Sequence, residues 1–187
     1  SLVGSEMCIR DRVFIELLDE IYPGTKDLFL VASKRSAGRS MFCGKQEFII
    51  QDIEEFDFSQ VEIAFFSAGA ETAEKYAPIA VSKGCTVIDN SSQFRTDSDK
   101  PLIVPEVNSK DLKNFKLPGI IANPNCSTAQ LVVALKPIHD LFKIERVDVA
   151  SYQSVSGTGK EGIDELLEQT ESFLNKKEIK PRAVSYT

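Results

Sequence analysis

Hydrophobic residues recur along this chain at two spacings, one typical of helices and one typical of strands. Val13, Leu17 and Ile21 repeat at helical spacing, and the run stops at Pro23. The stretch 61–66 is almost continuously apolar, as a buried strand is. The same criteria predict helices over 13–22, 71–83, 127–140 and 161–175, and strands over 27–32, 47–51, 61–66, 85–89, 119–122 and 145–154. Strands that alternate with helices predict an α/β fold built on a parallel sheet.

Four loops of polar or small residues follow predicted strands directly, at 33–39, 67–70, 90–95 and 123–126. The carboxyl ends of parallel strands meet at one edge of a sheet, where ligands bind in open α/β folds. We therefore expect the chemistry of this chain to gather at that edge.

Cys126 is the most informative of the loop residues. It follows the turn Asn123-Pro-Asn125 and opens the helix predicted over 127–140. Unpaired N–H groups and the positive end of the dipole at a helix N-terminus favour a nucleophilic thiolate. Its position alone allows an equal alternative, a small buried apolar residue, because unpaired cysteine is commonly buried.

Charge and cysteine usage exclude several classes of function. The net charge of −6, with no Lys/Arg cluster, argues against a nucleic-acid partner. No apolar run approaches the roughly 20 residues of a membrane helix, and no secretory signal is recognisable. Four scattered cysteines and a single histidine offer neither a metal site nor a disulfide framework. We therefore predict a cytoplasmic protein.

The two ends of the chain differ from what a nucleotide-binding domain of this type requires. Residues 1–12 contain no G-x-G-x-x-G motif and no apolar strand. We therefore expect that the first strand and the Gly-rich loop are missing, and that residues 1–12 are foreign or disordered. Residues 176–187 are polar and close no element, so we expect truncation at both ends.

Six motifs follow one another along the chain: Ser33-Lys-Arg-Ser-Ala-Gly-Arg39, Phe66-Ser-Ala-Gly69, Asp89-Asn-Ser-Ser-Gln-Phe-Arg95, Val104-Pro-Glu-Val-Asn108, Asn123-Pro-Asn-Cys-Ser-Thr128 and Ser151-Tyr-Gln-Ser-Val-Ser-Gly-Thr-Gly159. Each is weak alone, but together, from about Val13 to Thr170, they resemble the aspartate-semialdehyde dehydrogenase family. The resemblance implies a Rossmann-like doubly wound parallel sheet, forming an NADP-binding domain over 13–125. The start of an α+β catalytic and dimerisation domain would follow over 126–187.

The resemblance also implies an activity. Family members carry out the NADP-dependent reductive dephosphorylation of L-aspartyl 4-phosphate to L-aspartate 4-semialdehyde, in lysine, threonine and methionine biosynthesis. In the reverse direction, the thiolate matched by Cys126 adds to the aldehyde, hydride passes to NADP, and inorganic phosphate cleaves the resulting thioester. The family enzymes are homo-oligomers, dimers or tetramers, assembled through the second domain.

Roles for individual residues follow from the same resemblance. Cys126 matches the nucleophile and Asn125 stands where an amide would hold the oxyanion. Gln153 matches a residue that orients substrate, and Arg95 one that contributes to the phosphate pocket. The cofactor-binding positions are a basic, hydroxyl-bearing turn, a run of small residues and a Gly-bearing turn near the nicotinamide: Ser33, Arg35, Ser36, Ser67, Ala68, Gly69, Ser156, Gly157 and Gly159.

Taken without the resemblance, the same residues allow plainer alternatives. The basic turn is a solvated surface loop, the small residues allow tight helix–strand packing, Arg95 makes a surface ion pair, and the Gly-bearing segment is an ordinary strand-to-helix turn.

The family's acid–base histidine, which lies well downstream of the cysteine, has no match in this chain. His139 follows Cys126 by thirteen residues on the same predicted helix, about 20 Å away at 1.5 Å per residue. Direct proton transfer needs about 3 Å, so we predict a structural role for His139. We also predict that the isolated chain is inactive.

Two alternative functions remain open. N-acetyl-glutamyl-phosphate reductase shares the fold and the thioester chemistry, but typically has Gly before its Cys, where this chain has Asn125. The other alternative is a non-catalytic nucleotide-binding homologue. The joint presence of Cys126, Gln153 and Arg95 argues against a loss of catalysis in the parent protein.

Overall fold

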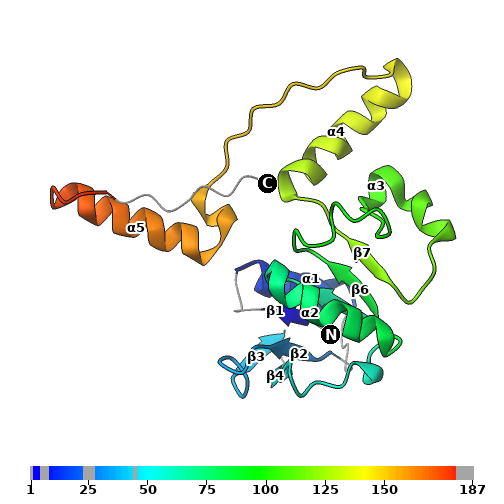
Figure 1. Ribbon diagram of the computed structural model, residues 1–187, viewed down its shortest axis with the longest axis horizontal. Coiled ribbons are helices and arrows are strands. Elements are labelled where there is room, and N and C mark those ends of the chain that lie inside the picture. Colours follow the sequence, from blue (N-terminus) through cyan, green and yellow to red (C-terminus); the bar gives the residue numbers. More distant parts are fainter. Residues whose placement is uncertain (1, 5–8, 23–27, 44–45, 180–187) are drawn as a thin grey trace. The chain divides into compact units, whose positions relative to one another are not determined.

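A computed structural model of the chain describes residues 2–4, 9–22, 28–43 and 46–179 (Figure 1). The chain divides into two compact units, Ser1–Arg146 and Val147–Thr187. The domain boundary predicted between residues 125 and 126 stays a prediction; in the structure, the helix that begins at Cys126 belongs to the first compact unit. It follows a strand of the sheet after a turn of only three residues, which ties it to that unit.

The first unit is built around a seven-stranded sheet. Its strands are Leu2–Gly4 (β1), Leu30–Ala32 (β2), Ser40–Cys43 (β3), Gln46–Asp52 (β4), Ile63–Phe66 (β5), Thr86–Asp89 (β6) and Ile120–Ala122 (β7), in the spatial order β3-β4-β2-β1-β5-β6-β7. Neighbouring strands are parallel except for the antiparallel pair β3–β4. Without β3, the strand order is that of a Rossmann-like doubly wound sheet, with its reversal point between β1 and β5. The predicted fold class is therefore confirmed.

One prediction about the start of the chain is wrong. We expected no strand before Val13, yet β1 lies between β2 and β5 at the centre of the sheet. Three residues are sufficient to form this strand because Leu2 and Val3 pair with both neighbouring strands. Without β1, the sheet would be split between β2 and β5. The remainder of the segment predicted to be foreign or disordered includes residues 1 and 5–8, which lie outside the described residues, as does the place of the Gly-rich loop.

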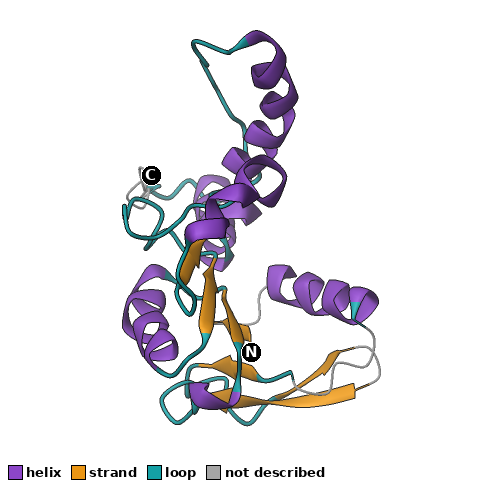
Figure 2. Ribbon diagram, turned by 90° about the vertical axis from the view of Figure 1, so that its right-hand side faces the viewer, coloured by secondary structure: helices purple, strands orange, loops and turns teal. Residues whose placement is uncertain are grey.

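Helices cover both faces of this sheet (Figure 2). Neighbouring residues of β2 pack against helices on opposite faces of the sheet. Val31 belongs to the hydrophobic cluster that includes α2 (Ala70–Ser82), whereas its neighbour Leu30 packs with Ile15 of α1 (Ile9–Ile21) on the opposite face. Successive strand residues point to opposite faces, so β2 supplies both clusters.

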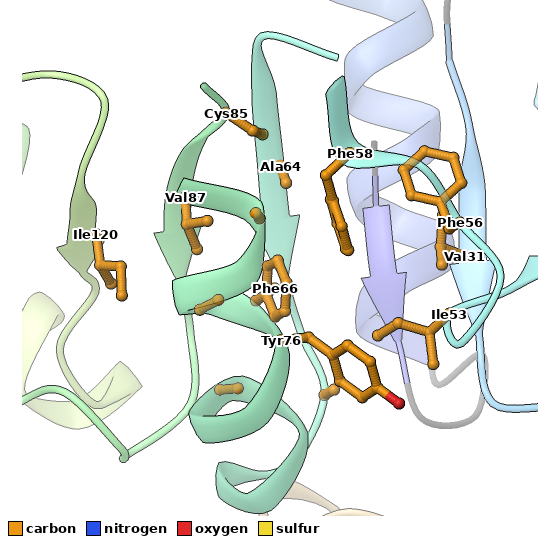
Figure 3. Close-up of a cluster of buried hydrophobic side chains, with 14 of the residues drawn as sticks. Val31, Ile53, Phe56, Phe58, Ala64, Phe66, Tyr76, Cys85, Val87 and Ile120 are labelled. Atoms are coloured by element: carbon orange, nitrogen blue, oxygen red, sulfur yellow. The ribbon is translucent and has the colours of Figure 1, made fainter. Parts of the chain in front are cut away.

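The larger cluster lies between the sheet and α2 (Figure 3). Phe58, Phe66 and Val87 are almost completely buried there, and Tyr76 of α2 packs against the same cluster. Phe56 meets Phe58 edge to face with ring centroids 5.1 Å apart. Burial of each such side chain contributes about 1.5–3 kcal/mol, which fixes the sheet as a rigid base for the loops at its edge.

The predicted helices over 13–22, 71–83 and 127–140 correspond to α1, α2 and α4 (Cys126–Phe142). The sequence pattern missed the short elements, which have too few residues to show a period. These are β3, the helix α3 (Pro105–Asn108), and the 3₁₀ turns η1 (Phe58–Gln60) and η2 (Ser109–Asn114).

The second unit contains the 3₁₀ turn η3 (Val155–Thr158) and α5 (Lys160–Leu174), which corresponds to the helix predicted over 161–175. The strand predicted over 145–154 is wrong, because the structure describes this segment without regular structure. Val147 and Val149 alternate as in a strand, but they are exposed and no described strand pairs with them. No helix within the described ranges is long and apolar enough to cross a membrane.

Candidate active site

Four loops of the first unit start at the ends of strands. β2, β5, β6 and β7 end immediately before Ser33, Ser67, Asn90 and Asn123. These strands run parallel to one another within the sheet, so their carboxyl ends lie along one edge. The prediction that these four loops lie along one edge of the sheet is confirmed.

Cys126 is the first residue of α4, and its side chain is exposed. Asn125 caps this helix, because its Oδ1 accepts the Ser127 N–H at 2.9 Å. The same oxygen lies 3.8 Å from the Cys126 Sγ. With the amide oxygen held by the backbone, Nδ2 is the group through which Asn125 can donate to a ligand. The exposed thiol excludes the alternative of a small buried residue.

Arg95 joins the loop after β6 to the turn that carries Cys126. Its Nε donates to the backbone carbonyl of Asn123 at 3.0 Å, and its Nη2 donates to that of Asn90 at 3.1 Å. The side chains of these two residues also meet, as Asn123 Nδ2 donates to Asn90 Oδ1 at 2.7 Å. Within the described residues Arg95 forms no surface ion pair, and its hydrogen bonds leave both N–H groups of Nη1 for an anion.

A buried carboxyl group accepts hydrogen bonds from the loop that follows β6. Asp89, the last residue of β6, is fully buried and accepts hydrogen bonds from the Ser91 hydroxyl at 2.6 Å and the Ser91 N–H at 3.1 Å. Burial raises the pKa of Asp89, and the bonds from Ser91 and the charge of Arg95 oppose that rise. Sequence reasoning assigned no role to Asp89 or Ser91.

The basic, hydroxyl-bearing turn that we expect to bind the cofactor follows β2 at the same edge of the sheet. Ser33 and Arg35 are exposed, whereas Ser36 is buried and its N–H donates to the Ser33 carbonyl at 2.8 Å. Gly38 has a positive φ of 81°, which lets the chain turn from this loop into β3. The turn thus presents a cation and a hydroxyl to solvent beside β1.

The loop after β5 contains an unusual buried hydroxyl. The Oγ of Ser67 is shielded from solvent but makes no hydrogen bond with any described residue. Ala68 is buried, and Gly69 is the N-cap of α2. A Cβ at Gly69 would contact no atom within 4 Å, so there is open space beside the backbone here. A buried hydroxyl without a partner and an open approach to backbone fit a bound polar ligand.

The predicted residues of the second unit lie together within that unit. The Gly157 N–H donates to the Ser154 carbonyl at 2.9 Å, and the Gly159 N–H to the Ser156 carbonyl at 3.0 Å. A Cβ at Gly157 would overlap the side-chain amide of Gln153, so glycine there makes room for that glutamine. Gly159 has a φ of 90° and is the N-cap of α5. The strand expected before this turn is absent, but the turn itself does lead into a helix.

His139 lies on α4 near the end opposite Cys126, as predicted, and its side chain is exposed. The helix rises about 1.5 Å per residue, which places the imidazole far from the thiol. Cys85, which directly precedes β6, is fully buried. Burial raises the pKa of its thiol, which leaves Cys126 as the exposed thiol among the two cysteines whose side chains are described.

Sequence reasoning missed Asn90 and Asn123 as site residues. Both stood inside quoted motifs, and both directly follow strands that had been predicted. Their position at adjacent strand ends was the available signal, because β6 and β7 are neighbours in the sheet. Their hydrogen bonds could not be read from the sequence, since the order of the strands was not known.

Comparison with known families supports the reading from the motifs. Residues 11–115 match the family model described as semialdehyde dehydrogenase, NAD binding domain, and residues 135–187 match semialdehyde dehydrogenase, dimerisation domain. An aspartate-semialdehyde dehydrogenase of Shewanella violacea is 54% identical over 164 residues, which cover 87% of this chain and 48% of that protein.

Solved structures give the same result. The aspartate semialdehyde dehydrogenase II of Vibrio cholerae, complexed with ASA, matches with a TM-score of 0.86 and 47% identity, over 99% of this chain and 55% of its own. An aspartate semialdehyde dehydrogenase with NADP from Candida albicans matches with a TM-score of 0.63 and 29% identity, over 76% of this chain and 48% of its own.

The chain spans about half the length of the curated relatives it matches. The family models nevertheless cover most of its residues, and the relatives that match it are named aspartate-semialdehyde dehydrogenases. The resemblance found in the motifs is therefore confirmed, and the chain belongs to the semialdehyde dehydrogenase family.

Proposed function

We propose that this chain carries the nucleophile and much of the cofactor site of an NADP-dependent aspartate-semialdehyde dehydrogenase. The observation that supports this most directly is the exposed thiol of Cys126 at the capped start of α4, in a turn to which Arg95 donates a hydrogen bond at Asn123. The relatives' names supply the substrate class, and the lysine, threonine and methionine pathways follow from it.

The first chemical step proposed is acylation of Cys126. The thiolate attacks the acyl carbon of L-aspartyl 4-phosphate and forms a C–S bond. The bond between the acyl carbon and the bridging phosphate oxygen breaks, and inorganic phosphate leaves. Asn125 Nδ2 donates to the oxyanion that develops on the carbonyl oxygen. Arg95 offers its Nη1 hydrogens to the phosphate, while Nε and Nη2 remain on backbone carbonyls. Gln153 orients the substrate.

NADP is the proposed cofactor, and its reduced form, NADPH, would supply the hydride that reduces the thioester. The residues that would hold it are those of two turns beside β1: Ser33, Arg35 and Ser36 after β2, and Ser67, Ala68 and Gly69 after β5. The buried hydroxyl of Ser67 and the open space beside Gly69 fit a ligand there. A cation with hydroxyls after the second strand suits a 2′-phosphate. The turn Ser156, Gly157 and Gly159 would lie close to the nicotinamide.

The deciding experiment measures the acylation half-reaction alone. The chain is incubated with L-aspartyl 4-phosphate, and peptide mass spectrometry locates the aspartyl thioester. We expect acylation of Cys126 and none of Cys85, whose buried thiol serves as a control within the same molecule. The Cys126→Ser variant should give no thioester. Absence of acylation at Cys126 in the folded chain would contradict the proposal.

A parallel incubation separates the alternative functions. N-acetyl-L-glutamyl 5-phosphate tests the related reductase, and acylation by neither phosphate points to a non-catalytic homologue. Complete turnover is not expected from the chain alone, because no acid–base histidine lies near the thiol within the described residues. Phosphate-dependent formation of NADPH that is lost on Cys126→Ser would contradict that expectation.

A further inference from the structure

We propose that Asn90 and Asn123 are positioning residues that hold the turn bearing Cys126, an inference that rests on the proposed nucleophilic role of that cysteine. The two side chains meet through a single hydrogen bond of 2.7 Å from Asn123 Nδ2 to Asn90 Oδ1. Both residues are half-buried, and neither touches the sulfur in any described hydrogen bond.

Asn123 is held by three of its polar groups at once. Its N–H donates to the Asp89 carbonyl at 2.7 Å, its carbonyl accepts from Arg95 Nε at 3.0 Å, and its Nδ2 bonds Asn90. All three partners belong to the end of β6 or to the loop that follows it. A backbone that is bonded on its N–H, carbonyl and side chain has little freedom to rotate.

The partner loop is itself fixed to the sheet. The Asn90 N–H donates to the Phe66 carbonyl at 2.8 Å, and the Asn90 carbonyl accepts from Arg95 Nη2 at 3.1 Å. The Asn90 side chain therefore presents Oδ1 to the nucleophile turn from a base that is anchored on β5.

The path from Asn123 to the thiol is short and stiff. Pro124 follows, buried and with its φ fixed by the ring, and Asn125 is then locked as the N-cap of α4. Cys126 comes next. Motion of the Asn123 backbone would thus move the first turn of α4 and the sulfur with it, so the Asn90–Asn123 bond sets the position of the nucleophile.

Two variants with the same chemical change test this. Asn123→Asp replaces the donor Nδ2 by an oxygen and sets two acceptors against each other. Asn90→Asp keeps an acceptor where Asn123 Nδ2 donates. Each variant adds one negative charge near the thiol, so a difference between them reports the hydrogen bond and not the charge.

The first readout is amide hydrogen exchange at Ser127 and Ala129, whose N–H groups bond to Asn125 in the first turn of α4. We expect exchange to rise about tenfold in Asn123→Asp, the factor that corresponds to the loss of one hydrogen bond, and to stay near the wild-type rate in Asn90→Asp. The second readout is the rate of Cys126 acylation by L-aspartyl 4-phosphate, which should be about tenfold lower in Asn123→Asp than in Asn90→Asp.

The outcomes distinguish this proposal from the proposed function. If the wild-type chain is not acylated, the proposed function fails, and amide exchange still decides whether the turn is clamped. Equal effects of the two variants on exchange would overturn the positioning role. Labelling of the buried Cys85 by iodoacetamide in Asn123→Asp would overturn it too, because Asn123 would then hold the whole sheet and not the turn.

Discussion

Single side chains near the edge of the sheet differ in their exposure to solvent. Cys126 is exposed at the start of α4, whereas Cys85 and Asp89 are buried within the β6 region. The environment decides the difference: a thiol or carboxyl in an apolar interior favours its neutral form. Of the two thiols whose side chains the structure describes, Cys126 is therefore the one that solvent and ligands can reach.

Asp89 should make the stability of the chain depend on pH. Its pKa is raised in the folded state above the ordinary value near 3.8, mainly by burial. The folded state then holds this proton more tightly than the unfolded state, so the contribution of Asp89 to stability is greatest below pH 3.8 and is lost as pH rises through the folded pKa. In urea unfolding, the Asp89→Asn variant should gain stability relative to wild type between acid and neutral pH. An unchanged difference between the two proteins would contradict this.

The sequence predicted the nature of these side chains better than their partners. Cys126 and Arg95 stood out through residue type and motif, and the structure describes them as exposed and hydrogen-bonded, respectively, at the predicted edge. The clamp between Asn90 and Asn123 could not be predicted, because it depends on β6 and β7 lying side by side. Likewise, it is packing and not sequence that leaves the Ser67 hydroxyl without a hydrogen-bond partner among the described residues.

At the scale of elements, the periodic helices and the short strands within apolar runs (β2, β5, β6 and β7) were predicted, whereas β1 and β3 were not. The apolar faces of α1, α2 and α4 carry enough positions to reveal a helical period. β1 has three residues and β3 has four, too few for any period, and they gain stability only from the neighbours they pair with. The exposed valines of 147–154 show the converse, an alternating pattern without a partner strand.

The two glycines that bracket α2 should respond differently to the same substitution. A Cβ would meet no atom at either position, but Gly84 has a φ of 92° and Gly69 one of −65°. Gly84→Ala should cost about 1–2 kcal/mol of unfolding free energy, because an L residue is strained at positive φ. Gly69→Ala should cost less than about 1 kcal/mol, the price of a poorer N-cap.

The same pair tests the cofactor site. If NADPH approaches the backbone beside Gly69, its fluorescence titration should show weaker binding to Gly69→Ala and wild-type binding to Gly84→Ala. Equal affinities for both variants would remove Gly69 from the proposed site.

At the scale of the whole molecule, the ends of the last two helices are among the places where large apolar side chains are exposed. Leu141 and Phe142 at the end of α4, and Phe173 and Leu174 at the end of α5, are each more than two-thirds exposed. Apolar residues of this kind, grouped within the match to a dimerisation domain, favour association between copies.

Self-association should therefore depend on the second unit. We expect Phe173→Glu to shift the chain toward monomer in analytical ultracentrifugation, because a charge at a buried interface is strongly unfavourable. Ile49→Glu, at a comparably exposed site on β4, is the matched control and should leave the association unchanged. A loss of association in the control alone would place the interface on the face of the sheet at β4.

The bond between Asn90 and Asn123 also bears on the order in which the chain assembles. It joins residues 33 positions apart, and closing a loop of that length costs about 3 kcal/mol of chain entropy. Helix α4 can form early from its own local contacts, but the turn before it cannot be fixed until β6 and β7 have paired. In a newly synthesised chain, the position of the Cys126 thiol is therefore not fixed until β6 and β7 have paired. A thiol held in its final position thus indicates that the sheet has formed.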